Sequence, residues 1–186
     1  MNTKEIIDIS TWERKEHYEF FGNLPDPFFG LTAKIDFTEC FKQAKADGAS
    51  FFLYSLHHIL TAVNAVPQLR CRIEDGSFGF AYFEWHEARS IFAAEATKEI
   101  ERVKSSSGLG TNGNERRTDL IYFTSIPWVD FTGIRHAGGY RPGDSIPQIA
   151  VGKLTDHEGR KMMTVAIEAN HGLADGRHIG QFFNLL

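Results

Sequence analysis

The sequence has few cysteines, and their positions exclude two kinds of stabilised architecture. Cys40 and Cys71 are the only cysteines, and neither belongs to a Cys-x-x-Cys pair or to another spacing typical of metal ligands. We therefore expect no disulfide framework and no metal site. Unpaired thiols are typical of a reducing compartment, so we expect a cytoplasmic protein.

Long hydrophobic runs are also lacking. No 18 apolar residues follow one another, and residues 1–8 have neither the charged head nor the long apolar core of a signal peptide. We expect a protein that is neither exported nor inserted into a membrane.

Positive charge is not in excess, because 20 basic residues stand against 24 acidic ones, for a net charge of -4. No run of Lys and Arg is long enough for nucleic-acid binding. Residues 108–113 match G-x-G-x-x-G, but this segment follows a predicted helix and opens none, so the context for a dinucleotide is missing. The sequence also lacks the Gly-x-Ser-x-Gly elbow of serine hydrolases and a phosphate loop with a following lysine.

Phenylalanine is abundant, with 16 residues in a chain of 186 that is 42% hydrophobic. This content suffices for one hydrophobic core, so we expect a single domain over residues 1–186. Some phenylalanines are neighbours, as in Phe20-Phe21 and Phe28-Phe29. Core packing is the simpler explanation of such residues, and an apolar pocket for an aromatic ligand is the alternative.

Hydrophobic periodicity predicts strands mixed with helices. Strands are predicted over residues 31–37, 69–73, 78–83, 89–93, 119–125, 146–154 and 162–169. Helices are predicted from residue 38 to a left-handed end at Gly48, over 52–63 and 98–104, and after a cap at Asp175. Turns are predicted at 75–76 and 156–159, and an exposed loop over 105–117. The mixture indicates an α/β fold, a two-layer sandwich in which helices flank a mixed β-sheet.

One motif places chemically active side chains between the last predicted strand and the last helix. It runs Asn170-His171-Gly172-Leu173-Ala174-Asp175-Gly176, and such junctions often carry functional sites. His171 can act as a general base near neutral pH, and Asp175 can orient a neighbour or cap the helix. Taken alone, a packed or solvated histidine and a simple helix cap are the more common explanations.

Other candidate residues lack partners in the sequence. His57 and His58 are about 100° apart on a helix, so they cannot chelate one metal as an i, i+4 pair would. Glu168 has no second carboxylate at a spacing that supports glycosidase chemistry.

Four blocks along the chain match one family pattern. Residues 12–20 are similar to Trp-x-Arg-x-x-His-aromatic-x-Phe, and residues 31–36 resemble a first core strand. Residues 124–129, Thr-Ser-Ile-Pro-Trp-Val, are similar to a Ser-x-x-Pro-Trp segment. Together with residues 171–176, these blocks resemble the chloramphenicol acetyltransferase family.

The resemblance implies a CoA-dependent acyltransferase fold and acetyl transfer from acetyl-CoA to a hydroxyl of chloramphenicol or a similar small molecule. His171 stands in the place of the general base, with its ring fixed through Nδ1. Asp175 stands in the place of a structural aspartate that pairs with an N-terminal arginine, here Arg14. Thr124 replaces the serine whose hydroxyl binds the tetrahedral oxyanion.

The resemblance also implies a homotrimer with active sites between subunits, in which the histidine of one chain faces an acceptor pocket largely built by the next, and a link to antibiotic resistance. The residues implied to line the acceptor pocket are Phe20, Phe21, Leu24, Phe28 and Phe29, which favours a ligand pocket for these phenylalanines. Trp128 and Lys153 stand at positions whose side chains approach the coenzyme in members of the family. Acetyl-CoA is a cosubstrate, and no tightly bound cofactor is implied.

Some positions depart from the family pattern. Asn170 replaces the first of two consecutive histidines, Arg135 and His136 replace apolar side chains near the acceptor, and the region between Phe92 and Lys98 is shorter. Acetyl transfer is therefore better supported than chloramphenicol as the acceptor.

Two alternative functions stay open. The first is a dihydrolipoamide acyltransferase core, which shares His-x-x-x-Asp-Gly but predicts a lipoyl domain and a linker that we do not find in the sequence. The second is a trimeric protein that binds a small hydrophobic ligand without turning it over. Joint retention of His171, Asp175, Arg14 and a hydroxyl at Thr124 argues against a pure binder.

Overall fold

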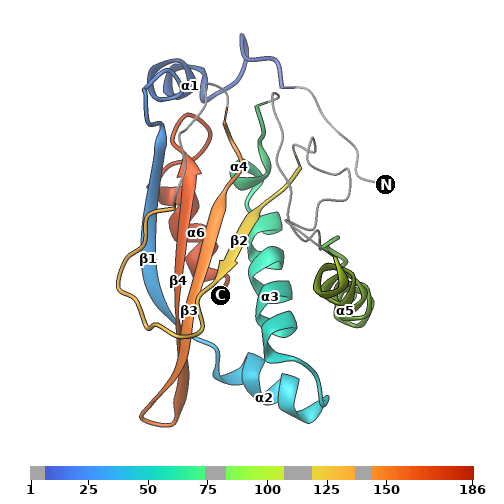
Figure 1. Ribbon diagram of the computed structural model, residues 1–186. Coiled ribbons are helices and arrows are strands. Elements are labelled where there is room, and N and C mark those ends of the chain that lie inside the picture. Colours follow the sequence, from blue (N-terminus) through green and yellow to red (C-terminus); the bar gives the residue numbers. More distant parts are fainter. Residues whose placement is uncertain (1–6, 74–82, 107–118, 137–143) are drawn as a thin grey trace.

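A computed structural model describes residues 7–73, 83–106, 119–136 and 144–186. Within these residues four strands form one sheet in the order β1-β4-β3-β2, as Figure 1 shows. The strands are β1 (Phe28–Asp36), β2 (Tyr122–Ser125), β3 (Gln148–His157) and β4 (Arg160–Asn170). β4 is antiparallel to both β1 and β3, whereas β2 is parallel to β3. The sheet is therefore mixed, as predicted.

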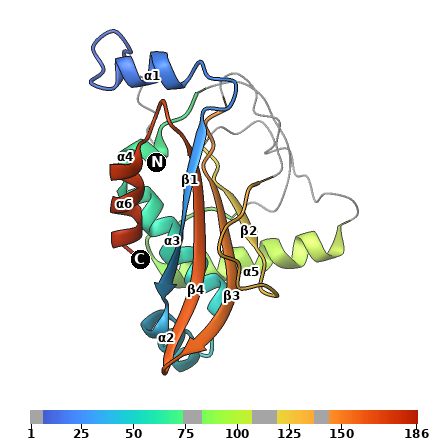
Figure 2. The same cartoon turned by 90° about the vertical axis from the view of Figure 1, so that its left-hand side faces the viewer.

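Helices cover one face of this sheet (Figure 2). The described helices are α1 (Lys15–Phe21), α2 (Thr38–Ala46), α3 (Phe51–Ala65), α4 (Pro67–Arg70), α5 (Arg89–Ser105) and α6 (Gly176–Asn184). α3 and α6 pack on the sheet, and α5 packs against α3 through a second apolar cluster. The predicted α/β class is confirmed.

The segment that follows β2 crosses the opposite face of the sheet. Asp130 in this segment accepts a hydrogen bond from Thr164 of β4 at 3.0 Å and pairs with Lys34 of β1 at 2.5 Å. Phe131 of this segment packs closely on β3 at Gly152. A Cβ at that position would lie only 3.2 Å from the Phe131 ring, so a glycine suits it. These contacts fix the chain between Thr124 and His136 against the sheet.

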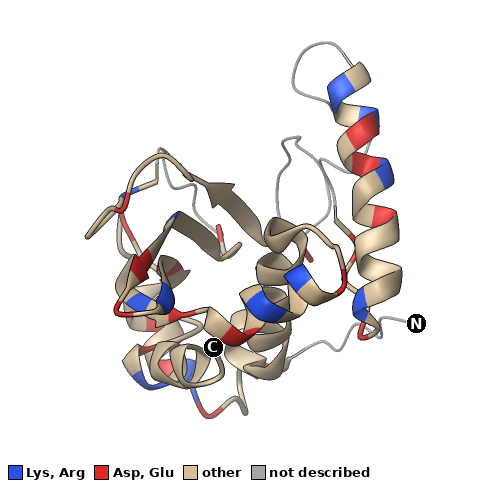
Figure 3. Ribbon diagram, turned by 90° about the horizontal axis from the view of Figure 1, so that it is seen from below, with Lys and Arg blue, Asp and Glu red and all other residues tan. Residues whose placement is uncertain are grey.

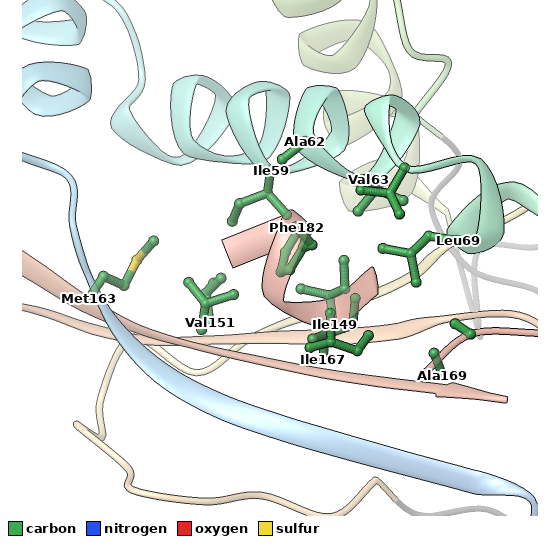
Figure 4. Close-up of a cluster of buried hydrophobic side chains, with 14 of the residues drawn as sticks. Ile59, Ala62, Val63, Leu69, Ile149, Val151, Met163, Ile167, Ala169 and Phe182 are labelled. Carbon is green, nitrogen blue, oxygen red and sulfur yellow. The ribbon is translucent and has the colours of Figure 1, made fainter. Parts of the chain in front are cut away.

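The main core lies between the sheet and two helices, and Figure 4 shows its side chains pointing toward one another. Ile149 of β3, Ile167 of β4, Ile59 of α3 and Phe182 of α6 are all 0% exposed. The apolar stripe predicted over residues 52–63 is thus confirmed as the face that α3 buries. Burial of aliphatic and aromatic side chains at this interface is the main force that orders β4 and the residues after it.

Two predicted turn glycines have the expected conformation. Gly48 has φ +60 beyond the end of α2, and Gly159 has φ +80 in the turn between β3 and β4. Glu158 also has a positive φ of 52, and two consecutive positive values are typical of the tight turn that matches strand twist in a hairpin. The turn predicted over residues 156–159 is confirmed.

Two strand predictions are wrong. Residues 67–70 form the short helix α4, because Pro67 occupies its first turn, and residues 71–73 have no regular structure. Residues 89–93 begin helix α5, in which Phe92 and Ala96 lie one turn apart and are buried. A short apolar run suits a strand and a buried helix equally, and packing against α3 decides for the helix. The helix predicted over 98–104 is confirmed as the later part of α5.

Other predictions lie outside the described residues. These include the second hairpin strand up to residue 82, the turn at 75–76, the G-x-G-x-x-G match and residues 107–117 of the expected loop.

The length and hydropathy of the described helices decide whether any of them could span a membrane, and Figure 3 shows where charged residues lie. Among the helices that the structure describes, none is both long enough and apolar enough to cross a membrane. Figure 3 shows positions of acidic and basic residues interspersed along α5.

Candidate active site

The end of β4 positions His171. Its backbone N–H donates to the carbonyl of Pro27 at 2.7 Å, which extends the pairing of β4 with β1 by one bond. The buried side chain of Asn170 accepts from the N–H of Gly172 at 2.9 Å. Gly172 is suited to this turn, since a Cβ there would lie 3.2 Å from the backbone nitrogen of Gly22. Strand pairing and a side-chain hydrogen bond thus define the backbone on both sides of the histidine.

Two phenylalanines hold the imidazole of His171. The ring of Phe21 stacks on it with centroids 3.9 Å apart and planes 5° from parallel, and the ring of Phe29 lies 4.4 Å away at 35°. Nδ1 of His171 is buried and has no hydrogen-bond partner in the described part of the chain. The hydrogen bond expected at Nδ1 is therefore not found within the described residues. The two ring contacts hold the imidazole instead.

Asp175 and Arg14 form the predicted ion pair. Nη1 of Arg14 donates to Oδ2 of Asp175 at 2.7 Å, and Arg14 is only 7% exposed although it lies just before α1. The other carboxylate oxygen of Asp175 accepts from the N–H groups of Arg177 and His178, so Asp175 caps α6 as predicted. One carboxylate thus joins the N-terminal segment, the His171 loop and the last helix.

The charge of Asp175 is strongly favoured. Burial acts to raise the pKa of its carboxyl, but the hydrogen bond from Arg14, the charges of His178 and Arg14 and the bond from the Arg177 N–H lower the pKa to about 2. His178 completes the cap, because its Nδ1 accepts from the Asp175 N–H at 3.1 Å. Burial lowers the pKa of His178, against the opposing effect of Asp175.

Thr124 lies in β2 and belongs to a different part of the surface. It is exposed in the single chain, and so is Trp128, at 80%. Lys153 is near this segment, since its backbone N–H donates to the carbonyl of Val129 at 2.9 Å. The structure therefore brings the predicted oxyanion donor and the two predicted coenzyme-side residues to one edge of the sheet.

The sheet register separates Thr124 from His171. Thr124 pairs with Ala150, which pairs with Ala166, and Asn170 lies four residues farther along β4. Strands about 4.8 Å apart and a rise of about 3.3 Å per residue place the two Cα atoms at least about 15 Å apart. One chain therefore does not bring Thr124 and His171 together.

The predicted acceptor residues gather beside His171. Phe20 and Leu24 are 67% and 43% exposed, while Phe21, Phe28 and Phe29 are half-buried. Phe20 meets Phe21 edge-on at 4.9 Å. This apolar surface adjoins the ring of His171 and has the composition expected for binding an aromatic ligand.

Comparison with known proteins identifies the family. The model of the family "Chloramphenicol acetyltransferase" matches residues 1–93 and 75–186. The chain belongs to the chloramphenicol acetyltransferase family. Its relatives include the chloramphenicol acetyltransferase of Proteus mirabilis, which is 27% identical over 99% of this chain and 95% of its own length. That of Clostridium perfringens is 25% identical over 96% and 91%.

Solved structures agree with this membership of the chloramphenicol acetyltransferase family. A structure named chloramphenicol acetyltransferase matches with a TM-score of 0.87 and 29% identity, over 98% of this chain and 97% of its own. A dihydrolipoamide acetyltransferase from Azotobacter vinelandii matches with a TM-score of 0.61 and 14% identity, over 98% and 89%. The second likeness shows a shared fold alone.

Sequence reasoning missed two contacts of titratable side chains in this member of the chloramphenicol acetyltransferase family. Glu168 pairs with His136 at 2.9 Å, and His178 completes the cap at Asp175. The first pair spans two distant segments, so no spacing rule reveals it. The second has a local signal, because residue N3 of a helix commonly completes a capping box, although Glu or Gln is the usual residue there.

Proposed function

We propose that this protein transfers the acetyl group of acetyl-CoA to a hydroxyl of chloramphenicol or a similar small molecule, with His171 as the general base. The observation that carries this proposal is the stacked imidazole of His171, a partly exposed side chain beside an apolar aromatic surface. Membership of the family supplies the reaction class.

The proposed reaction follows from these groups. Nε2 of His171 takes the proton of the acceptor hydroxyl while the hydroxyl oxygen attacks the thioester carbonyl of acetyl-CoA. The hydroxyl of Thr124 donates to the oxyanion of the tetrahedral intermediate. Collapse of the intermediate breaks the C–S bond, and the leaving CoA sulfur receives the proton from His171. Asp175 and Arg14 act structurally, because their ion pair and helix cap hold the loop that carries His171.

We propose that the complete site forms between subunits of a homotrimer. An oxyanion donor works at hydrogen-bond distance from the reacting carbonyl, which must also lie beside the base. Thr124 of the same chain is too distant from His171 in the sheet register, so Thr124 of the partner subunit must take that role. Trp128 and Lys153 share the surface of Thr124 and would then approach the coenzyme.

Exposed apolar side chains support such an assembly. Leu31 on β1 is 49% exposed, and Trp128 and Val129 near β2 are 80% and 52% exposed. These side chains lie at the two opposite edges of the sheet, where a neighbouring subunit on either side could cover them. We also propose a cytoplasmic location and a role in resistance to chloramphenicol. Both cysteines are free thiols, as expected in a reducing compartment.

Release of free CoA thiol from acetyl-CoA tests the proposed function. Chloramphenicol, other alcohols, amines and dihydrolipoamide serve as acceptors for the wild type, His171→Ala and His157→Ala. His157 is an exposed histidine at the far end of β3 and is the matched control. We expect turnover of chloramphenicol or a related alcohol by the wild type and by His157→Ala, with a loss of at least about 100-fold in His171→Ala.

The other outcomes separate the alternatives. If dihydrolipoamide is the only acceptor that is turned over, the protein is a dihydrolipoamide acyltransferase and chloramphenicol is not its acceptor. Equal, negligible thiol release by wild type and His171→Ala with every acceptor would favour a protein that binds ligands without turnover.

A further inference from the structure

His136 and Glu168 form a second histidine–carboxylate pair that the proposed mechanism does not use. Nδ1 of His136 lies 2.9 Å from Oε2 of Glu168, and the two side chains are only 11% and 13% exposed. Glu168 belongs to β4 three residues before His171, and His136 comes from the segment that crosses the sheet. The pair therefore lies on the face of β4 opposite the helices.

Two contacts connect this pair to residues 26–30, the segment that carries part of the predicted acceptor surface. Glu168 is opposite Gly30 in the register of β4 with β1, and a Cβ at Gly30 would lie only 2.7 Å from Cγ of Glu168. The stem of Glu168 thus crosses the position that follows Phe29. On the other side, Arg135 forms an ion pair with Asp26, between Leu24 and Phe28.

The hydrogen bond within the pair determines what the other nitrogen of His136 can do. When the Nδ1–H of a neutral imidazole donates to a carboxylate, Nε2 carries a lone pair and accepts a hydrogen bond. Nε2 of His136 is buried, and no described residue gives it a hydrogen bond. A buried polar atom without a partner is costly, so this nitrogen is suited to a donor that a ligand brings.

We propose that the His136–Glu168 pair determines acceptor specificity by binding a second hydroxyl of the acceptor, distinct from the one that is acetylated. The inference rests on the proposed function, because it assigns the pair to the acceptor pocket. Glu168 orients the ring, and Nε2 of His136 accepts the hydrogen bond of the second hydroxyl. The substrate class is therefore a diol with an apolar or aromatic part, which the phenylalanines bind.

The test compares two acceptors that differ in one hydroxyl. Chloramphenicol carries two hydroxyls, and its 1-deoxy analogue lacks the one that is not acetylated. For the wild type we expect kcat/KM to be about tenfold or more higher for chloramphenicol, since a site built to bind a hydroxyl rejects the analogue without it. His136→Leu should raise KM for chloramphenicol by about tenfold, change kcat less than twofold and leave the deoxy analogue unaffected. His136→Gln, which keeps a hydrogen-bond acceptor, should restore part of the preference.

A matched control is available beside α5. His86 and Glu95 form an exposed pair at 2.7 Å. His86→Leu breaks this histidine–carboxylate pair but leaves the His136–Glu168 pair intact. Both acceptors should behave with His86→Leu as with the wild type. If His136→Leu lowers kcat equally for both acceptors, the pair is catalytic or structural and the specificity role is overturned.

Calorimetry keeps this inference separate from the proposed function. Chloramphenicol and its 1-deoxy analogue are titrated into the wild type and His136→Leu without acetyl-CoA. Absent turnover together with weaker binding of chloramphenicol alone in the variant would contradict the proposed function but support the pair as a recognition element. Equal dissociation constants in both proteins, or no binding to the wild type, would overturn the inference.

Discussion

The ring of Phe21 lies almost parallel to the imidazole of His171, with centroids 3.9 Å apart. Phe21 ends α1, whereas His171 follows β4, so the stack joins the N-terminal helix to the last strand. Because Nδ1 of His171 has no partner within the described residues, this stack takes the orienting role that a hydrogen bond to Nδ1 often has.

Replacing Phe21 by Leu should therefore reduce turnover more than stability. Leucine keeps apolar volume but loses the parallel stack, which is worth about 0.5–1.5 kcal/mol beyond area burial. We expect kcat to fall about 3- to 10-fold as the imidazole becomes less well oriented, measured by thiol release at saturating acceptor. Phe41→Leu is the control, because Phe41 is a half-buried ring of α2 that meets Phe51 and not His171. Equal kcat in Phe21→Leu and wild type would show that the stack does not orient the base.

The ion pair of Arg14 with Asp175 should stabilise the folded protein. Arg14→Met leaves a buried carboxylate without its cation, and the loss of one partner of such a pair typically costs about 3–5 kcal/mol. We expect a loss near the lower end, about 3 kcal/mol, because the Asp175 side chain is still 28% exposed and keeps its bonds to the start of α6. Urea unfolding at one fixed protein concentration measures this, since assembly also affects stability. Lys15→Met, at an exposed neighbouring position, should change stability by less than about 0.5 kcal/mol.

Acid should remove the contribution of Asp175 in a defined pH range. Its folded pKa of about 2 lies below the ordinary value of 3.8, so the folded protein binds this proton more weakly than the unfolded chain does. The resulting stability is present above pH 3.8 and is lost as the pH falls from there toward 2. At about 1.4 kcal/mol per pKa unit, the loss is about 2 kcal/mol. Urea unfolding between pH 6 and pH 2 should show this excess loss in the wild type relative to Asp175→Asn. Parallel curves for the two proteins would exclude the carboxylate as its source.

The sequence carries most of the local structure of the site. Asp175 before an amphipathic helix predicts a cap, and the family pattern predicts its pairing with Arg14; both are found. Tertiary packing explains what was missed. Residues 89–93 are apolar enough for a strand, but packing of Phe92 against α3 favours a helix. The pairing of His136 with Glu168 depends on how the chain crosses the sheet, which no local periodicity encodes.

Mixing two inactive variants should restore activity if the complete site lies between subunits. His171→Ala removes the base, and Thr124→Val removes the hydroxyl donor, which should lower kcat about 100- to 1,000-fold, whereas Thr124→Ser should retain activity. When both chains assemble at random in equal amounts, about one quarter of the interfaces combine an intact His171 with an intact Thr124 of the partner subunit. Thiol release after co-expression should therefore reach about one quarter of the wild-type rate per site.

The register of the sheet makes this prediction discriminating. Thr124 and His171 of one chain are at least about 15 Å apart, so a subunit that acted alone would have neither site complete. Chains that are purified separately and mixed without unfolding provide the control, since subunits that do not exchange should stay inactive. If co-expressed chains also stay inactive while forming mixed oligomers, the base and the oxyanion donor do not meet across an interface, and another hydroxyl or N–H group must stabilise the oxyanion near His171.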